Sequence, residues 1–101
     1  MDQLNPVISI ITPTFNRSHE LDQLIKSINS QTLDHKYFEM IISDDGSKDD
    51  TEKKIKKWSD VVDFKLKYIS QNNLGPGAAR NHGVKNSIGE FIVFIDSDCE
   101  A

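Results

Sequence analysis

Cysteine is nearly absent from this sequence, which has only Cys99. A single cysteine excludes an internal disulfide and a zinc site built from several thiolates, and it fits a reducing compartment. Long apolar runs are also missing, because none approaches the roughly 18 residues of a membrane span. Positive charge is scarcer than negative charge, and the net charge of −4 disfavours a general affinity for nucleic acid or an acidic membrane. We therefore expect a cytoplasmic protein that does not bind nucleic acid; attachment to the inner face of a membrane would need regions absent here.

The 101 residues are enough for one domain with a modest core. Apolar residues make up 37% and charged residues 28%, which is typical of a globular chain rather than a disordered one. We expect residues 1–6 to be disordered and residues 7–101 to form the single domain.

One stretch near the C-terminus organises the predicted fold. Residues 91–95 form an uninterrupted apolar run, which predicts a strand buried on both faces inside a parallel sheet. We expect further strands within residues 7–11, 37–43 and 61–69, and helices that begin near residues 18, 47 and 76. The resulting βαβαβαβ order predicts a three-layer, Rossmann-like α/β fold with a parallel sheet and right-handed crossovers.

Local signals refine the expected boundaries. Pro13 is expected to end the first strand, because proline cannot continue a central hydrogen-bond ladder. Ser18 is expected to cap the first helix, and Ser47 with Asp50 has the spacing of a capping box for the second. Residues 61–69 alternate between apolar side chains and lysines, so we expect this strand near the sheet edge.

Two carboxylates follow the last predicted strand, in the segment Asp96-Ser97-Asp98. Asp96 and Asp98 are two positions apart and can point the same way, just past the carboxyl end where open α/β sheets bind ligands. Two neighbouring carboxylates repel unless a cation lies between them, so Mg²⁺ or Mn²⁺ with a phosphate co-ligand suits this place. The alternative is an ordinary polar turn.

The loop after the first strand offers four candidate ligand contacts. Pro13 gives a rigid turn, Phe15 an aromatic shelf for a flat base, Asn16 an amide and Arg17 a cation. The alternative for Phe15 is a hydrophobic staple that packs back on the first helix.

Two other loops should meet it at the same edge of the sheet. Of Asp44 and Asp45, one is explained as the neighbour of a helix N-terminus, which leaves the other to accept a hydrogen bond from a ligand. Gly75 lies where a helix begins and lets a phosphate come close. Arg80 opposes the dipole of that helix, so we expect it to face the ligand rather than an internal carboxylate such as Asp44.

Four blocks together resemble family 2 glycosyltransferases with the GT-A fold. They read TPTFNR at 12–17, DDGSKDDT at 44–51, NLG at 73–75 with ARN at 79–81, and GE at 89–90 followed by DSD at 96–98. The resemblance covers residues 7–98 and implies inverting, metal-assisted transfer of a sugar from a UDP- or GDP-sugar to an acceptor hydroxyl on a sugar, lipid-linked glycan or glycan.

The same resemblance implies roles for the residues that match its blocks. Pro13 and Phe15 would line the base pocket and Asp45 would bond the base. Arg80 would reach the base or the diphosphate. Asp96 would touch the ribose or a metal-bound water, and Asp98 would ligate the metal.

The sequence departs from that pattern in its extent. Family members continue past the Asp-x-Asp block into an acceptor-binding half that supplies the general base, so we expect this chain to be the donor-binding half, inactive alone and self-associated. Two other functions stay open, a nucleotidyltransferase-like domain and a non-catalytic nucleotide-binding module. A third reading is an α/β domain whose polar loops are only turns and caps.

Overall fold

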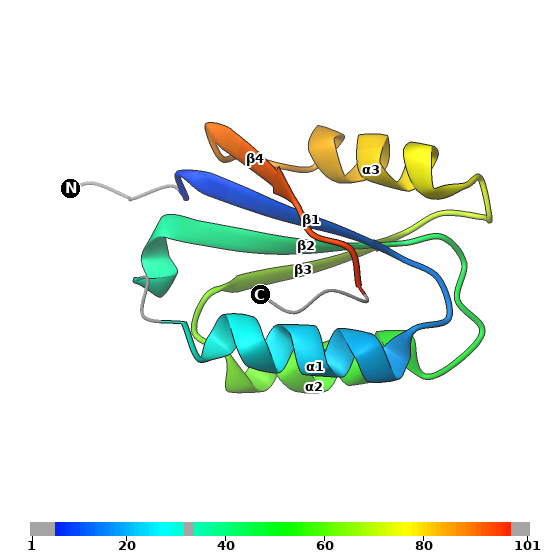
Figure 1. The fold of residues 1–101 in the computed structure, drawn as a ribbon, viewed down its shortest axis with the longest axis horizontal. Helices are drawn as coiled ribbons and strands as arrows, with labels where there is room; N and C mark the ends of the chain where they lie inside the picture. The colour runs from blue at the N-terminus through cyan, green and yellow to red at the C-terminus, as the bar shows by residue number, and fades with distance from the viewer. Residues whose placement is uncertain (1–5, 32–33, 98–101) are drawn as a thin grey trace.

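The computed structural model of the protein describes residues 6–31 and 34–97, in which strands and helices alternate along the chain (Figure 1). The elements are β1 (Ile8–Thr14), α1 (Ser18–Asn29), a short 3-10 helix η1 (His35–Tyr37), β2 (Phe38–Asp44), α2 (Thr51–Val61), β3 (Lys65–Ser70), α3 (Pro76–Lys85) and β4 (Phe91–Phe94). Residues 1–5 of the segment 1–6 that we expect to be disordered, and Asp98, the predicted metal ligand, lie outside the described residues.

All strand pairs are parallel, and the strand order is β3-β2-β1-β4. Helices α1 and α2 lie together on one face of the sheet, and α3 covers β1 and β2 on the other (Figure 1). The predicted three-layer α/β fold is therefore confirmed, as is the edge position of the third strand.

The core between the sheet and α1 follows from the spacing of apolar residues. Leu21, Leu24, Ile25 and Ile28 fall on one side of α1 and are at most 4% exposed. They join a cluster of buried side chains from the strands and α2. Its members outside α1 are Ile10, Phe38, Met40, Ile42, Ile55 and Phe64.

Helix α3 lies unusually close to the sheet because its inner face is made of small residues. Ala79 and Gly83 are its buried positions. A Cβ atom added at Gly83 would lie 2.5 Å from Cγ2 of Ile11, so only glycine fits there without movement of β1 or α3. This contact sets how closely α3 packs on β1 at Ile11.

Three predicted local features are wrong. Ser18 does not cap α1, because it is the first residue of that helix and the N-cap position is Arg17, without a side-chain cap hydrogen bond. Pro13 does not end β1, which pairs with β2 as far as Thr14; the pairing of β1 with β4 stops at Ile11, so Pro13 lies where one side of β1 is open. Ser47 and Asp50 do not form a capping box, because α2 begins at Thr51 and the Ser47 hydroxyl donates to Asp44.

The burial predicted for the last strand is also wrong. Phe91, Ile92, Val93 and Phe94 are between 37% and 62% exposed, because β4 is an edge strand with no helix over it among the described residues. Its apolar composition is typical of a buried strand, but at the edge of this sheet all four side chains remain exposed.

A buried carboxylate holds the segment that leads into β4. Glu39 in β2 is fully buried, and it accepts hydrogen bonds from the Ser9 hydroxyl (2.6 Å) and the Ile88 amide (2.8 Å). The Lys67 ammonium lies 3.0 Å from its other oxygen. Burial alone would raise the pKa of Glu39, but these partners outweigh it and lower the pKa below 4.5.

None of the described helices is long and apolar enough to cross a membrane.

Candidate nucleotide-binding site

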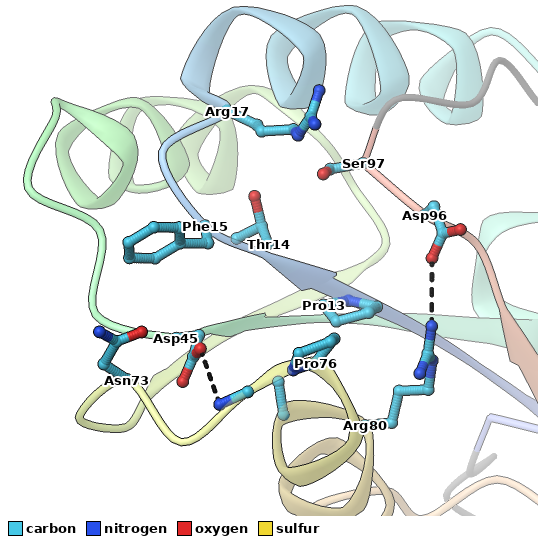
Figure 2. A pocket seen from close by; sticks show the side chains of 12 residues that line it. Pro13, Thr14, Phe15, Arg17, Asp45, Asn73, Pro76, Arg80, Asp96 and Ser97 are labelled. Carbon is cyan, nitrogen blue, oxygen red and sulfur yellow. Dashed lines mark hydrogen bonds and ion pairs between the residues drawn. The ribbon is translucent and has the colours of Figure 1, made fainter.

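A pocket of about 520 Å³ opens at the carboxyl-terminal edge of the sheet (Figure 2). Residues that follow each of β1, β2, β3 and β4 line it, as expected where the carboxyl ends of parallel strands meet. The structure brings together eight of the predicted site residues: Pro13, Phe15, Arg17, Asp45, Gly75, Arg80, Asp96 and Ser97. Its volume is in the range of small-molecule sites.

Asp45 directly follows β2 and ties the loop between β3 and α3 to the pocket. Its Oδ1 accepts from the Gln71 side chain (2.9 Å) and the Leu74 amide (2.6 Å), and its Oδ2 accepts from the Gly75 amide (3.0 Å). Burial would raise the pKa of the Asp45 carboxyl, but these three donors outweigh it and hold the pKa below 3.8. Asp45 therefore holds the chain in place immediately before α3.

Two arginines line the pocket in different electrostatic settings. Arg80, in the second turn of α3, lies 3.8 Å from an oxygen of Asp96. It lines the pocket and does not pair with the buried Asp44, but it does pair with an internal carboxylate, that of Asp96. Arg17 also lines the pocket, and none of the carboxylates among residues 6–31 and 34–97 forms an ion pair with it. Arg17 and Arg80 come from opposite faces of the sheet and are both drawn around the same pocket in Figure 2.

Phe15 is 44% exposed and lines the pocket, so the alternative in which it packs back on α1 is not what the structure has. Pro13, one residue before the end of β1, lies nearer the middle of the pocket (Figure 2). Sequence reasoning left four other lining residues out of the predicted site: Thr14, Asn73, Pro76 and Ala79. All four lie within or beside the polar sequence blocks, and this position in the sequence is the signal from which they could have been predicted.

Asp44 and Asn16, also predicted to bind substrate, do not line this pocket. Asp44 is 1% exposed and accepts from the backbone amide and hydroxyl of Ser47 and from the hydroxyl of Tyr68. Burial and the Asp44 carboxylate raise the pKa of Tyr68 far above its usual value, which keeps the phenol protonated as a donor. The Asn16 side chain accepts from the Lys48 amide.

Asp96 is the described half of the predicted metal pair. Its side chain is 56% exposed beside the pocket. A carboxylate oxygen is the ligand type that Mg²⁺ and Mn²⁺ take, and such ions use one or two carboxylates together with substrate phosphates. Among residues 6–31 and 34–97 no group of three acidic, histidine or cysteine side chains could hold a metal ion. Asp96 alone is a carboxylate of the type that such an ion takes beside phosphate oxygens.

The fold and pocket define an α/β domain with a ligand-sized pocket at the carboxyl-terminal edge of its sheet, and comparison with known proteins identifies its family. The family model described as glycosyl transferase family 2 matches residues 9–101. The chain belongs to this family, and the resemblance read from its four blocks is confirmed.

Three relatives show how much of such proteins the chain represents. It is 41% identical over 97 residues to the GalNAc(5)-diNAcBac-PP-undecaprenol beta-1,3-glucosyltransferase of Campylobacter jejuni, covering 94% of this chain and 30% of that protein. A crystal structure of Staphylococcus aureus TarS in complex with UDP-GlcNAc has a TM-score of 0.79 at 34% identity, over 90% of this chain and 26% of that one. Glucosyl-3-phosphoglycerate synthase of Mycobacterium tuberculosis, solved with Mn²⁺ and UDP, has a TM-score of 0.67 at 25% identity, over 94% and 36%. The chain thus spans about a third or less of these relatives.

Proposed function

We propose that this chain binds the nucleoside diphosphate sugar donor, a UDP- or GDP-sugar, of a glycosyltransferase. The observation that carries the proposal is that one pocket gathers an exposed aromatic ring, the Asp45 carboxylate, two arginines and the acidic edge at Asp96. The base would lie between Phe15 and Asp45, and the arginines would meet the diphosphate.

In the proposed reaction an acceptor hydroxyl attacks the anomeric carbon from the face opposite the departing nucleoside diphosphate, which inverts that centre. The residues of this chain hold the donor in place for that attack and orient its leaving group. Asp96, with Asp98, would hold a Mg²⁺ or Mn²⁺ ion, which supplies positive charge against the charge that builds up on the diphosphate. The acceptor proton passes to a general base that we assign to residues beyond this chain.

Two relatives support the choice of donor and acceptor class. TarS was solved with UDP-GlcNAc, and the Campylobacter relative is named as a glucosyltransferase acting on an undecaprenol-linked glycan. We propose a nucleotide sugar as donor and a sugar, lipid-linked glycan or glycan as acceptor in the whole protein.

A thermal-shift screen with UDP, GDP, CDP and ADP, each with and without Mn²⁺, tests the proposal. A ligand at a hundredfold excess over its Kd stabilises the protein by about 2.7 kcal/mol, so UDP or GDP should raise Tm by roughly 10 to 20 °C for a domain of this size. Asp96→Asn should reduce the part of the shift that depends on Mn²⁺. No shift with any of the four nucleotides would refute the proposal.

Two rival functions give different results once the corresponding nucleoside triphosphates are added to this screen. A nucleotidyltransferase-like domain would prefer a nucleoside triphosphate over the diphosphate, and a chain whose polar loops are only turns and caps would bind neither. A non-catalytic nucleotide-binding module would bind as we propose, and only activity of the whole protein separates it from a transferase. The chain alone should transfer no sugar from labelled donors.

A further inference from the structure

We propose that Asn16 is a positioning residue that sets the place of Phe15 in the donor pocket and does not itself touch the donor. This inference rests on the proposed function. It revises the simplest reading of the TPTFNR block, in which Asn16 would contact the ligand directly.

The backbone at Asn16 is in a conformation that few residues adopt. Its φ is +52°, in the left-handed region that asparagine tolerates better than other non-glycine residues. Its amide donates to the Ser47 hydroxyl at 2.8 Å, and its side-chain Oδ1 accepts from the Lys48 amide at 2.7 Å. Both hydrogen bonds join the loop after β1 to the loop after β2.

The far end of this connection is fixed in the core. The Ser47 hydroxyl donates to Oδ1 of Asp44 at 2.5 Å, and the Tyr68 hydroxyl donates to the other oxygen of Asp44 at 2.5 Å. Asp44 is 1% exposed. The Ser47 hydroxyl has one proton to donate and can accept the Asn16 amide, so the whole set is satisfied at once. A continuous chain of hydrogen bonds, called the relay below, therefore runs from Tyr68 in β3 through Asp44 and Ser47 to Asn16. Asn16 is the residue after Phe15.

The segment that carries Phe15 is held on both sides. Before it, the Asp45 amide donates to the Thr14 carbonyl at 2.9 Å. After it, the Asn16 bonds are joined by a contact from the Ser18 amide to Asp49 at 3.2 Å. Figure 2 shows Phe15 and Asp45 at the same end of the pocket. The relay therefore fixes the distance between the aromatic ring and the Asp45 carboxylate.

Variants of Asn16 separate backbone conformation from hydrogen bonding. Asn16→Asp keeps the acceptor and tolerates the positive φ, Asn16→Gly keeps only the backbone conformation, and Asn16→Ala loses both. The Kd for the nucleotide that binds, UDP or GDP with Mn²⁺, should rise in the order Asp, Gly, Ala, with about a fivefold rise for alanine. Asn86→Ala is the matched control, because it removes an exposed asparagine side chain whose amide donates to the carbonyl of His82, one turn back at the end of α3.

A double-mutant cycle with Phe15 decides whether Asn16 acts through the ring. We expect Phe15→Ala to weaken nucleotide binding about tenfold, as expected for a lost aromatic contact. The Asn16→Ala change should then add less than about twofold in the Phe15→Ala background, because there is no ring left to position. If the two losses multiply, to about fiftyfold, Asn16 contacts the donor independently and the inference is refuted.

Amide hydrogen exchange without ligand separates this inference from the proposed function. Asn16→Ala should speed exchange at the Lys48 amide, which loses its acceptor, while Asn86→Ala should not. Unchanged exchange at Lys48 would overturn the relay. Failure of the unmodified protein to bind UDP or GDP would refute the proposed function, and with it the role of Asn16 in binding, while the exchange result still decides whether the relay exists.

Discussion

Replacing Asp45 by asparagine exchanges one oxygen for an NH₂ group and should destabilise the loop between β3 and α3, which forms one side of the pocket. The carboxylate serves three donors, from Gln71, Leu74 and Gly75. With its amide oxygen in the Oδ1 position, asparagine can still accept two of them, but its NH₂ group then faces the Gly75 amide. An unpaired buried donor costs about 1 to 3 kcal/mol, and two bonds lose their charge assistance, so we expect a total loss of roughly 2 to 4 kcal/mol.

Urea denaturation followed by circular dichroism measures this loss, with Asp50→Asn as the matched control because Asp50 caps α2 without a side-chain hydrogen bond. The direction in which this stability difference changes with pH is a second test. Because the pKa of Asp45 is lower in the folded protein than its usual 3.8, its contribution is present above about pH 4 and is lost as the pH falls through the folded pKa. The unmodified protein and the Asp45→Asn variant should therefore converge in stability under acid conditions. Equal stability at pH 7, or a gap that does not narrow as the pH falls below 3.8, would refute the role given to Asp45.

Three further predictions concern the framework. Glu39→Gln should lower stability at neutral pH by about 1.5 to 3 kcal/mol, because the hydrogen bonds to Glu39 are charge-assisted, and the loss should shrink in acid since the folded pKa is lowered; an unchanged urea midpoint would contradict this. Gly83→Ala should lower Tm through the clash with Ile11, whereas Gly77→Ala, which meets no atom within 4 Å, should raise stability by about 0.5 to 1 kcal/mol. The chain should self-associate through the open edge of β4, and Phe94→Lys should shift its sedimentation toward the monomer; a monomer at high concentration before substitution would count against this surface.

The fold was predictable where local pattern and tertiary structure agree. The stripe on α1 gave that helix directly, and Pro76 marked the start of α3 because proline fits the first turn. The end of β1 was not predictable, because the effect of Pro13 depends on where β4 stops pairing. The exposure of β4 was missed for the same reason: an apolar run indicates a preference for burial, and only the strand order reveals that no neighbour covers it.

The candidate site was predictable as a place more than as a set of contacts. Parallel strands bring their carboxyl ends together, so residues spread from Pro13 to Ser97 could be assigned to one pocket. Which polar side chains face outward was not readable, because internal partners compete for them. Asp44 is taken by Ser47 and Tyr68, and Asn16 by Lys48. A sequence shows the donor and acceptor groups without showing these pairings.

Nuclear magnetic resonance titration of the labelled chain with UDP and with GDP, in the presence of Mg²⁺, tests the central claim most directly. Chemical-shift changes should concentrate on Phe15, Asp45, Gly75, Arg80 and Asp96, and replacing Mg²⁺ with paramagnetic Mn²⁺ should broaden the signals nearest Asp96 first. Absence of changes with both nucleotides, or changes centred on the opposite end of the sheet around His35 and Phe64, would contradict a donor pocket at this edge.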